Sequence, residues 1–156
     1  MSSDTKDATS TVQQQYRMLH DIYVLLDDGD RRVLDNFGLT TSQYAVLMLL
    51  DRDDGRRLTT VSDKLLRARS TITRIVDQLE EFKLVRRVGD PEDRRAQRVI
   101  LTEEGERRCN QAHAAHLDSL QRRLTRLSVD EATALNLLLD KLRSALRDDL
   151  KTDNRR

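Results

Sequence analysis

The chain has 156 residues, of which 35% are charged, 37% hydrophobic and 3% aromatic, with a formal net charge of +1 at pH 7. This length suits one domain, and the composition is typical of a helical protein or of a subunit that completes its core by association. The chain contains no apolar run near the roughly 18 residues of a membrane span, and its polar N-terminus resembles neither a secretory signal nor a transit peptide. We therefore expect a cytoplasmic protein with no membrane contact and polar tails over residues 1–10 (disordered) and 151–156.

The first predicted element is a long helix from residue 11 to about residue 37. Its apolar residues recur on one side: Val12, Tyr16, Leu19, Ile22, Tyr23 and Leu26. The segment DDGD (27–30) interrupts this pattern, and glycine inside a helix costs about 1 kcal/mol. We therefore expect a kink or a short break there, and a helix end capped by Gly38.

Two shorter helices are predicted next. Thr40 and Gln43 have the spacing of a capping box for a helix that runs to Leu50, and the segment DDG (53–55) closes it. A third helix starts at Thr59 or Thr60 and ends in a tight turn before Arg69. Two short helices joined in this way are typical of a helix-turn-helix.

The stretch from residue 69 to 105 predicts a helix, a strand, a turn and a second strand. Ile72, Val76 and Leu79 have the spacing of a buried helical stripe. The opposite face carries side chains that can bond bases and phosphates: Ser70, Thr73, Arg74, Asp77 and Gln78. Apolar residues at 84–88 and 99–101 bracket a turn that holds the only proline, Pro91. A helix followed by a basic hairpin indicates a winged helix-turn-helix, so we expect binding to double-stranded DNA.

The charge distribution supports this interpretation. Residues 56–98 hold twelve Lys or Arg and seven Asp or Glu, a net charge of +5, whereas the remainder holds 16 and 20, a net charge of −4. A basic segment is more often a solvated face. Here it coincides with the segment that is predicted to read DNA.

The last two helices are predicted over residues 102–127 and 128–150. Thr102 caps the first, and Ser128 with Glu131 forms a capping box for the second. The second has an apolar stripe of Leu135, Leu138, Leu142 and Leu146. A winged module is complete without these helices or the first one, so their apolar faces suggest a homodimer. A twofold dimer would set two recognition helices about 34 Å apart on a pseudo-palindrome.

Three stretches match the pattern of one family. They are GLTTSQYAVLMLL (38–50), STITRIVDQLEEFKLVRR (70–87) and DRRAQRVILTEEG (93–105), the last with a D-x-R wing and L-T-x-x-G. On these stretches, and over about Val12 to Leu150, the chain resembles the MarR family of bacterial transcription regulators. The resemblance implies a mainly α (α+β) winged-helix dimer. We expect one domain over 11–150, with dimerisation helices at 11–37 and 102–150 and a DNA-binding lobe at 38–101.

The resemblance also implies which residues of the recognition helix contact bases. Those that would face the major groove are Ser70, Thr71, Thr73 and Arg74. Two of them have alternative roles. Arg74 could be a surface residue paired with Asp77 or Gln78, and Ser70 could serve as the helix N-cap.

In the wing, Asp93 and Arg95 match the D-x-R positions. In the family that arginine reaches the minor groove, and the aspartate steadies it by charge-assisted bonding. Arg94 and Arg98 would add phosphate or groove contacts, whereas Asp93 could be a turn residue only. Phosphate contacts, which set affinity and its salt dependence, are expected of Arg67, Arg69, Arg86 and Arg87.

Members of this family often respond to small phenolic or anionic ligands bound between the helical region and the winged lobe. Tyr16, His20 and Tyr23 share one face of the first helix beside Arg17, a set that could hold a carboxylate or a phenol. The alternative, which we favour, is packing in the dimer core with polar tips at its rim.

Cys109, His113 and His116 recur at helical spacing and are the only candidate metal ligands. The sequence near them has no further Cys or His to complete a four-ligand site, although Asp or Glu could. We interpret them as partly exposed helix residues and expect no metal or cofactor. A single cysteine also gives no disulfide framework, which agrees with a reducing compartment.

The chain has no glycine-rich phosphate loop, nucleophile elbow or HExxH motif, so we expect no enzyme activity. We expect a sequence-specific transcription regulator, and a repressor because a compact dimer can block polymerase by occupancy. The alternatives are an architectural winged-helix protein without a ligand, or a metal-responsive regulator.

Overall fold

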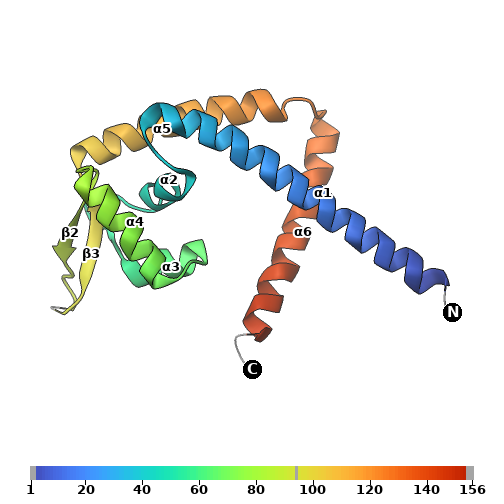
Figure 1. Ribbon diagram of the computed structural model, residues 1–156, viewed down its shortest axis with the longest axis horizontal. Helices are drawn as coiled ribbons and strands as arrows, with labels where there is room; N and C mark the ends of the chain where they lie inside the picture. The colour runs from blue at the N-terminus through green and yellow to red at the C-terminus, as the bar shows by residue number, and fades with distance from the viewer. Residues whose placement is uncertain (1–2, 94, 154–156) are drawn as a thin grey trace. The chain divides into compact units, whose positions relative to one another are not determined.

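The computed structural model describes residues 3–93 and 95–153. Its elements in this part of the chain are α1 (Ser3–Leu34), the 3-10 helix η1 (Asp35–Phe37), α2 (Thr41–Leu47), β1 (Arg56–Arg57), α3 (Leu58–Leu65), α4 (Arg69–Glu81), β2 (Val85–Gly89), β3 (Gln97–Leu101), α5 (Glu103–Leu124) and α6 (Val129–Asp153) (Figure 1). The chain divides into one compact unit up to Ser119 and a second from Leu120. The first unit carries the winged helix-turn-helix.

Helix α1 is longer and more regular than the sequence indicates. It begins at Ser3, within the segment where we expected a disordered tail, and no proline or glycine interrupts residues 3–28. The break expected at Gly29 is absent. Arg31 pairs with Asp27 and Asp28, at 3.2 and 3.3 Å, and Arg32 pairs with Asp28 at 2.8 Å. Pairs at these spacings each contribute a few tenths of a kcal/mol to a helix, which offsets part of the cost of glycine.

The link from α1 to α2 follows the predicted signals. Gly38 has a left-handed φ of 64° and its N–H donates to Asp35 O, so it caps η1 as expected. Thr40 Oγ1 accepts from the N–H of Gln43, and Gln43 Oε1 accepts from the N–H of Thr40. This is the predicted capping box. Helix α2 ends at Leu47, three residues earlier than expected.

The loop after α2 is closed by a carboxylate. Asp51 Oδ1 accepts from the N–H groups of Asp54 and Gly55, both at 2.8 Å, and these bonds hold the pKa of Asp51 below its usual value. Gly55 has φ of 62°, and a Cβ there would lie 2.3 Å from Ile100 Cγ2. The chain then forms β1, a two-residue strand that the sequence analysis missed.

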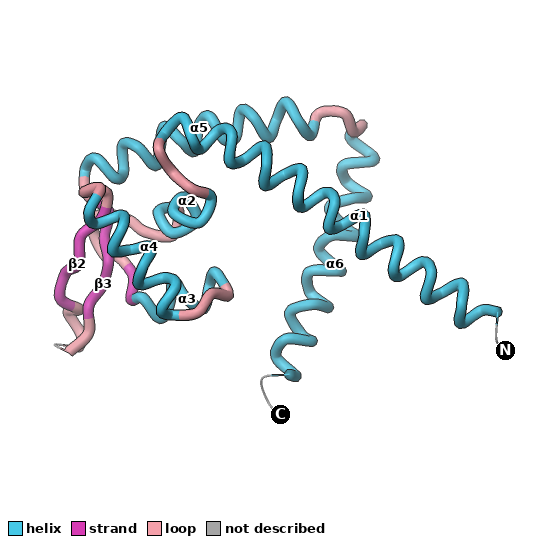
Figure 2. The backbone as a smooth tube through the Cα atoms, viewed as in Figure 1, coloured by secondary structure: helices cyan, strands magenta, loops and turns pink. Residues whose placement is uncertain are grey.

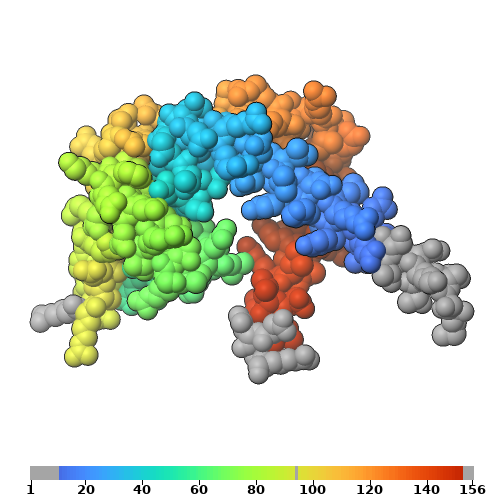
Figure 3. All heavy atoms as spheres, viewed as in Figure 1, coloured from blue at the N-terminus to red at the C-terminus, as the bar shows by residue number. Residues whose placement is uncertain are grey.

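The sheet has three antiparallel strands in the order β1-β3-β2. The predicted hairpin is β2 and β3, which pair from Val85 with Leu101 to Gly89 with Gln97. The turn between them lies at the free end of the hairpin (Figure 2). On the space-filling surface this end extends beyond the body of the lobe (Figure 3).

The core of the first unit lies under α4, where the helical lobe meets the sheet. The stripe predicted from α4 is buried, with Ile72, Val76 and Leu79 at 0% exposure, and Ile75 joins it at 8%. Other fully buried residues of the same cluster are Leu34, Leu39, Val46, Leu47, Val61, Leu84, Val85 and Val99. The winged lobe thus has a core of its own within one chain.

Helix α5 packs closely on the segment that links α4 to β2. Thr102 Oγ1 accepts from the N–H of Gly105, which confirms the predicted cap, and donates to Lys83 O. A Cβ on Gly105 would lie 1.8 Å from Leu84 O, so only glycine permits this approach of helix and backbone. The start of α5 is therefore fixed against the end of α4.

Helix α6 makes up most of the second unit. The predicted capping box is present, since Ser128 N donates to Glu131 Oε2 and Glu131 N donates to Ser128 Oγ. The helix continues to Asp153, into the expected polar tail. Its leucines are exposed, including Leu137, Leu138 and Leu146. Although α6 is the most leucine-rich helix, neither it nor any other described helix is long and apolar enough to cross a membrane.

Candidate nucleic-acid interface

The turn between α3 and α4 is fixed by the backbone. Leu66 has a left-handed φ of 50° and ends α3, and its side chain is 76% exposed. Ser62 binds Arg67 twice: its hydroxyl donates to Arg67 O at 2.7 Å, and its carbonyl accepts from Arg67 N at 3.1 Å. These bonds set where α4 begins.

The residues expected to face the major groove lie on the accessible side of α4. Ser70 and Arg74 are exposed, and Thr71 and Thr73 are half-buried. Ala68 is the N-cap, so Ser70 does not cap the helix. The Thr73 hydroxyl donates its hydrogen to Arg69 O at 3.0 Å, so Thr73 Oγ1 can bind a further group only by accepting a hydrogen bond.

Arginines of this surface fall into two groups. The guanidinium groups of Arg67, Arg69, Arg74, Arg86 and Arg95 form no ion pair or hydrogen bond with any described residue. The pairing of Arg74 with Asp77 or Gln78 is therefore not formed. Asp77 instead binds Arg87, which also binds Glu80. These carboxylates raise the pKa of Arg87, so Arg87 ties α4 to β2, in place of the phosphate contact we expected of it.

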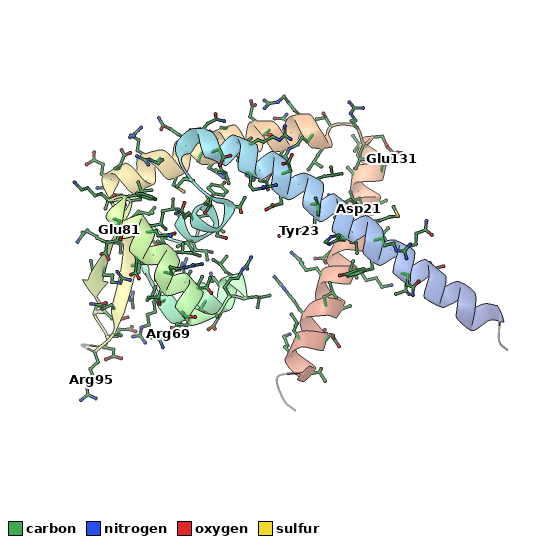
Figure 4. The ribbon with its side chains drawn as sticks, in the orientation of Figure 1. Asp21, Tyr23, Arg69, Glu81, Arg95 and Glu131 are labelled. Carbon is green, nitrogen blue, oxygen red and sulfur yellow. The ribbon has the colours of Figure 1, made fainter. Side chains whose placement is uncertain are left out.

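The wing turn is organised differently from the expectation. Asp93 Oδ1 accepts from the backbone N–H of Arg95 at 3.0 Å, and Asp93 O accepts from Ala96 N at 2.9 Å. Asp93 is thus a turn residue that does not hold the arginine side chain. Arg95 projects outward from the wing tip (Figure 4). Arg94 lies outside the described residues.

Asp90, which the sequence analysis did not single out, is the centre of the wing. Its side chain is fully buried and its Oδ2 accepts from Arg57 Nε at 2.6 Å and from Arg98 Nε at 2.8 Å. Its Oδ1 accepts from the N–H groups of Glu92 and Asp93. The hydrogen bonds from Arg57 and Arg98 hold the pKa of Asp90 far below its usual value. Arg98 is therefore bound to Asp90 within the wing, and the groove or phosphate contact expected of it stays a prediction.

The signal for Asp90 was present but weak. An aspartate directly before Pro91 is typical of a turn, yet nothing in the sequence says that two distant arginines converge on it. Arg57 belongs to a strand too short to give a pattern. The sequence therefore indicates the exposed arginines but not the residue that organises the wing.

The four candidate effector residues do not form one site. Tyr16 and His20 stack with ring centroids 6.4 Å apart, and both are exposed on α1, as is Arg17. Tyr23 alone borders a pocket of about 230 Å³, which we call the interhelical pocket. Its other lining residues are Asp27, Thr41, Ser42, Ala45, Leu65, Arg67, Thr71, Ile72 and Ile75. It lies between α1, α2, α3 and the start of α4.

The Cys and His residues of α5 serve packing. Cys109 is buried with its Sγ 3.7 Å from Met48 Sδ, and burial raises the pKa of the thiol. His113 Nδ1 lies 2.9 Å from the hydroxyl of Tyr44, and His116 Nε2 lies 3.0 Å from Asp30 Oδ1. Among the described residues, no group of three or more His, Cys, Asp or Glu is placed to hold a metal ion. The three side chains join α5 to α1 and α2.

Comparisons with known proteins agree with this geometry. The model of the MarR family matches residues 37–96. The HTH-type transcriptional regulator MhqR of Bacillus subtilis is 32% identical over 116 residues, which is 72% of this chain and 80% of MhqR. The alignment with MhqR is thus much longer than the winged lobe alone.

Two solved structures are similar in fold. A mutant of MarR from E. coli, complexed with operator DNA, is 26% identical, with 85% of this chain and 95% of that chain covered and a TM-score of 0.77. CouR from Rhodococcus jostii RHA1, bound to p-coumaroyl-CoA, is 29% identical, with 82% and 88% covered and a TM-score of 0.73. MhqR is a transcriptional regulator, which agrees with the prediction of a regulator in place of an enzyme. The chain belongs to the MarR family and is a DNA-binding transcription regulator.

Proposed function

We propose that this regulator is a homodimeric repressor that binds a pseudo-palindromic operator and is released by a small phenolic or anionic ligand. One observation carries the proposal. Five arginines lie on the helix-turn-helix and the wing with no side-chain partner among the described residues: Arg67, Arg69, Arg74, Arg86 and Arg95. By contrast, Arg57, Arg87 and Arg98 of the same lobe are bound to carboxylates. Cations left without partners on one surface are what a polyanionic duplex binds.

The proposed docking places α4 in the major groove and the wing against the neighbouring minor groove. Ser70, Thr71 and Arg74 would contact base edges, and Arg95 would enter the minor groove. The E. coli MarR mutant, similar in fold and crystallised with operator DNA, supports this assignment. Arg67, Arg69 and Arg86 would add phosphate contacts, which position the protein without reading sequence.

The dimer is proposed from the apolar faces of α1 and α6, with α5 completing the dimerisation region. Tyr16, Ile22 and Leu25 of α1 are 49–71% exposed, and Leu137 and Leu138 of α6 are 71% and 67% exposed. A monomer rarely exposes so many large apolar residues along two helices. Residues 11–37 and 102–150 would then hold two chains together, while residues 38–101 of each chain bind one half-site.

The interhelical pocket is the proposed ligand site. Three threonine and serine hydroxyls, the Tyr23 ring, the Arg67 guanidinium and an apolar floor suit a phenol or an aromatic carboxylate. CouR, whose structure contains p-coumaroyl-CoA, supports a ligand of this class. Arg67 and Thr71 are both pocket residues and proposed DNA contacts, so a bound ligand would compete directly with DNA for them.

The test begins with selection of fragments from the organism's own genome by the purified protein, followed by salt titration on the best fragment. A single pseudo-palindromic winner that the protein silences in a purified transcription assay is the expected result. Uniform binding to all fragments would instead indicate an architectural protein.

The ligand is tested separately with phenolic acids and their thioesters. Ala45→Leu fills the interhelical pocket and should retain operator binding while it loses release by the compound. Ala114→Leu, at an exposed position of α5 outside the pocket, is the matched control. Equal release from both variants would place the ligand elsewhere.

A further inference from the structure

A second pocket lies between the helix-turn-helix and the wing. It measures about 490 Å³ and is bordered by three arginines that come from three different parts of the chain. Arg57 comes from β1, Arg69 from the first residue of α4, and Arg95 from the wing turn. The remaining lining residues are Leu58, Thr59, Gly89, Ala96 and Gln97. We call it the wing pocket.

The three cations differ in how they are held. Arg69 and Arg95 make no side-chain bond with described residues, whereas Arg57 donates its Nε to Asp90 at 2.6 Å. This bond leaves the two Nη groups of Arg57 without a partner in the described part of the chain. Because a guanidinium is planar and rigid, the bond at Nε fixes the direction in which these Nη groups point.

The same carboxylate fixes the opposite wall of the pocket. Asp90 Oδ1 accepts from Glu92 N at 2.9 Å and from Asp93 N at 3.2 Å, and Asp93 in turn accepts from Arg95 N. Asp90 N also donates to Ala96 O at 3.1 Å, which closes the turn. One buried side chain therefore sets the position of β1 and of the turn that carries Arg95.

We propose that the wing pocket binds a backbone phosphate of duplex DNA through Arg57 and Arg69, at the edge of the minor groove that Arg95 enters, and that Asp90 is the positioning residue that holds two walls of the pocket together. Thr59 and Gln97 supply neutral donors at its rim. The inference rests on the proposed docking of α4 and the wing. It adds a phosphate site, with Arg57 as a contact, that the resemblance to the family did not assign.

Charge alone and positioning predict opposite effects for Asp90→Asn. Removal of the negative charge that pairs with Arg57 and Arg98 strengthens DNA binding by long-range attraction. Loss of the carboxylate that orients Arg57 and the wing turn weakens DNA binding, because a misplaced guanidinium loses its bidentate contact with the phosphate. The sign of the effect therefore separates the two accounts.

The experiment measures the dissociation constants of the full-length protein for its selected operator and for a random-sequence duplex at low salt. Asp90→Asn is expected to bind the operator about tenfold more weakly, a change of about 1.4 kcal/mol. Arg57→Lys keeps the cation, loses the Nε bond and is expected to weaken binding similarly. Glu104→Gln, which removes an exposed carboxylate that binds Arg107 and Arg108, is the matched control and should leave affinity unchanged.

A double-mutant cycle separates positioning from general destabilisation. Asp90→Asn should cost little further affinity in a background that carries both Arg57→Ala and Arg95→Ala, since both residues that it positions are already absent. Additive losses, or unchanged or tighter binding by both Asp90→Asn and Arg57→Lys, would overturn the proposal. Amide exchange at Glu92 and Asp93 provides the independent readout, and is expected to accelerate in Asp90→Asn.

Failure of the proposed function has a different signature. If the wild-type protein prefers no genomic fragment, sequence-specific regulation fails. The random-sequence duplex and the amide exchange then still decide whether Asp90 holds a phosphate-binding wing.

Discussion

The winged lobe and helix α6 place the same residue type in opposite environments. Leu79 on α4 is 0% exposed, whereas Leu138 on α6 is 67% exposed. Both belong to stripes of helical periodicity that look alike in the sequence. The difference teaches that periodicity identifies a face that must be covered, and that only the structure says whether the chain covers it by itself.

The two regions also differ in what their polar residues do. In the lobe, carboxylates bind arginines of other elements: Glu80 of α4 binds Arg87 of β2, and Asp90 binds Arg57 of β1, 33 positions earlier. On α6, Asp140 pairs with Arg143 and Asp148 pairs with Lys151. The two partners of each pair lie three residues apart, about one helical turn, and are exposed. Contacts between elements thus stabilise the lobe. Helix α6 is stabilised by contacts within the helix and by a partner that we propose to be a second copy of the chain.

The largest expected effect comes from leucine truncation in the two regions. Leu79→Ala should lower the free energy of unfolding by about 2–5 kcal/mol, because it leaves a cavity in a closed core. Leu138→Ala should instead lower the mid-point of thermal unfolding mainly at low protein concentration, since dissociation and unfolding are linked. Calorimetry over a hundredfold range of concentration checks both. A concentration-independent loss in Leu138→Ala would mean that α6 is covered within its own chain.

The free arginines of the lobe are expected to give the next effect. Arg74→Ala should cost about 1–3 kcal/mol of operator binding with some loss of base preference, whereas Arg95→Ala should weaken binding broadly and reduce the salt slope by about one. Fluorescence anisotropy at several salt concentrations measures both. Arg52→Ala, which removes an exposed arginine paired with Glu106, is the control. Unchanged affinity in both test variants would contradict the docking.

A smaller effect is expected at the helix caps, which both regions share. Thr40→Ala removes the cap of α2, whose bonds to the buried Gln43 are partly shielded from water, and should cost about 1 kcal/mol. Ser128→Ala removes the equivalent cap of α6, where water can replace the lost bond, and should cost less. Chemical denaturation compares them, and an equal loss would show that burial does not set the strength of these caps.

The smallest expected effect is the pH dependence of the α6 cap. Hydrogen bonds from Ser128 lower the pKa of Glu131 from 4.5, so its contribution to stability is present above pH 4.5 and is lost as the pH falls through the lower folded value. Glu131→Gln should therefore differ from the wild type at pH 7 and converge with it in acid. A difference that persists in acid, where the carboxyl is protonated in both the folded and the unfolded state, would exclude this carboxylate as its cause.

Local signals predicted local structure well. The capping boxes at Thr40 and Ser128, the cap at Gly38 and the stripe of α4 all depend on residues three or four apart, and each is formed. Gly29 was interpreted wrongly because its neighbours Asp28 and Arg32 compensate for it.

Features that depend on contacts between distant residues could not be predicted from the sequence. Asp90 binds Arg57, 33 positions earlier, and Arg87 binds Asp77 instead of remaining free. The interhelical pocket likewise draws residues from four helices and includes only Tyr23 of the suggested aromatic cluster. The sequence therefore predicts which residue types gather on the DNA-binding surface, whereas their pairing requires the fold.

The central claim is that two winged lobes bind one operator as a pair set by the helices outside them. The most direct test inserts five base pairs between the half-sites of the selected operator, which turns one half-site to the opposite face of the duplex. We expect affinity to fall at least about a hundredfold with five added base pairs, and to recover in part with ten. Equal affinity for all three spacings would contradict the claim and would mean that each lobe binds DNA alone.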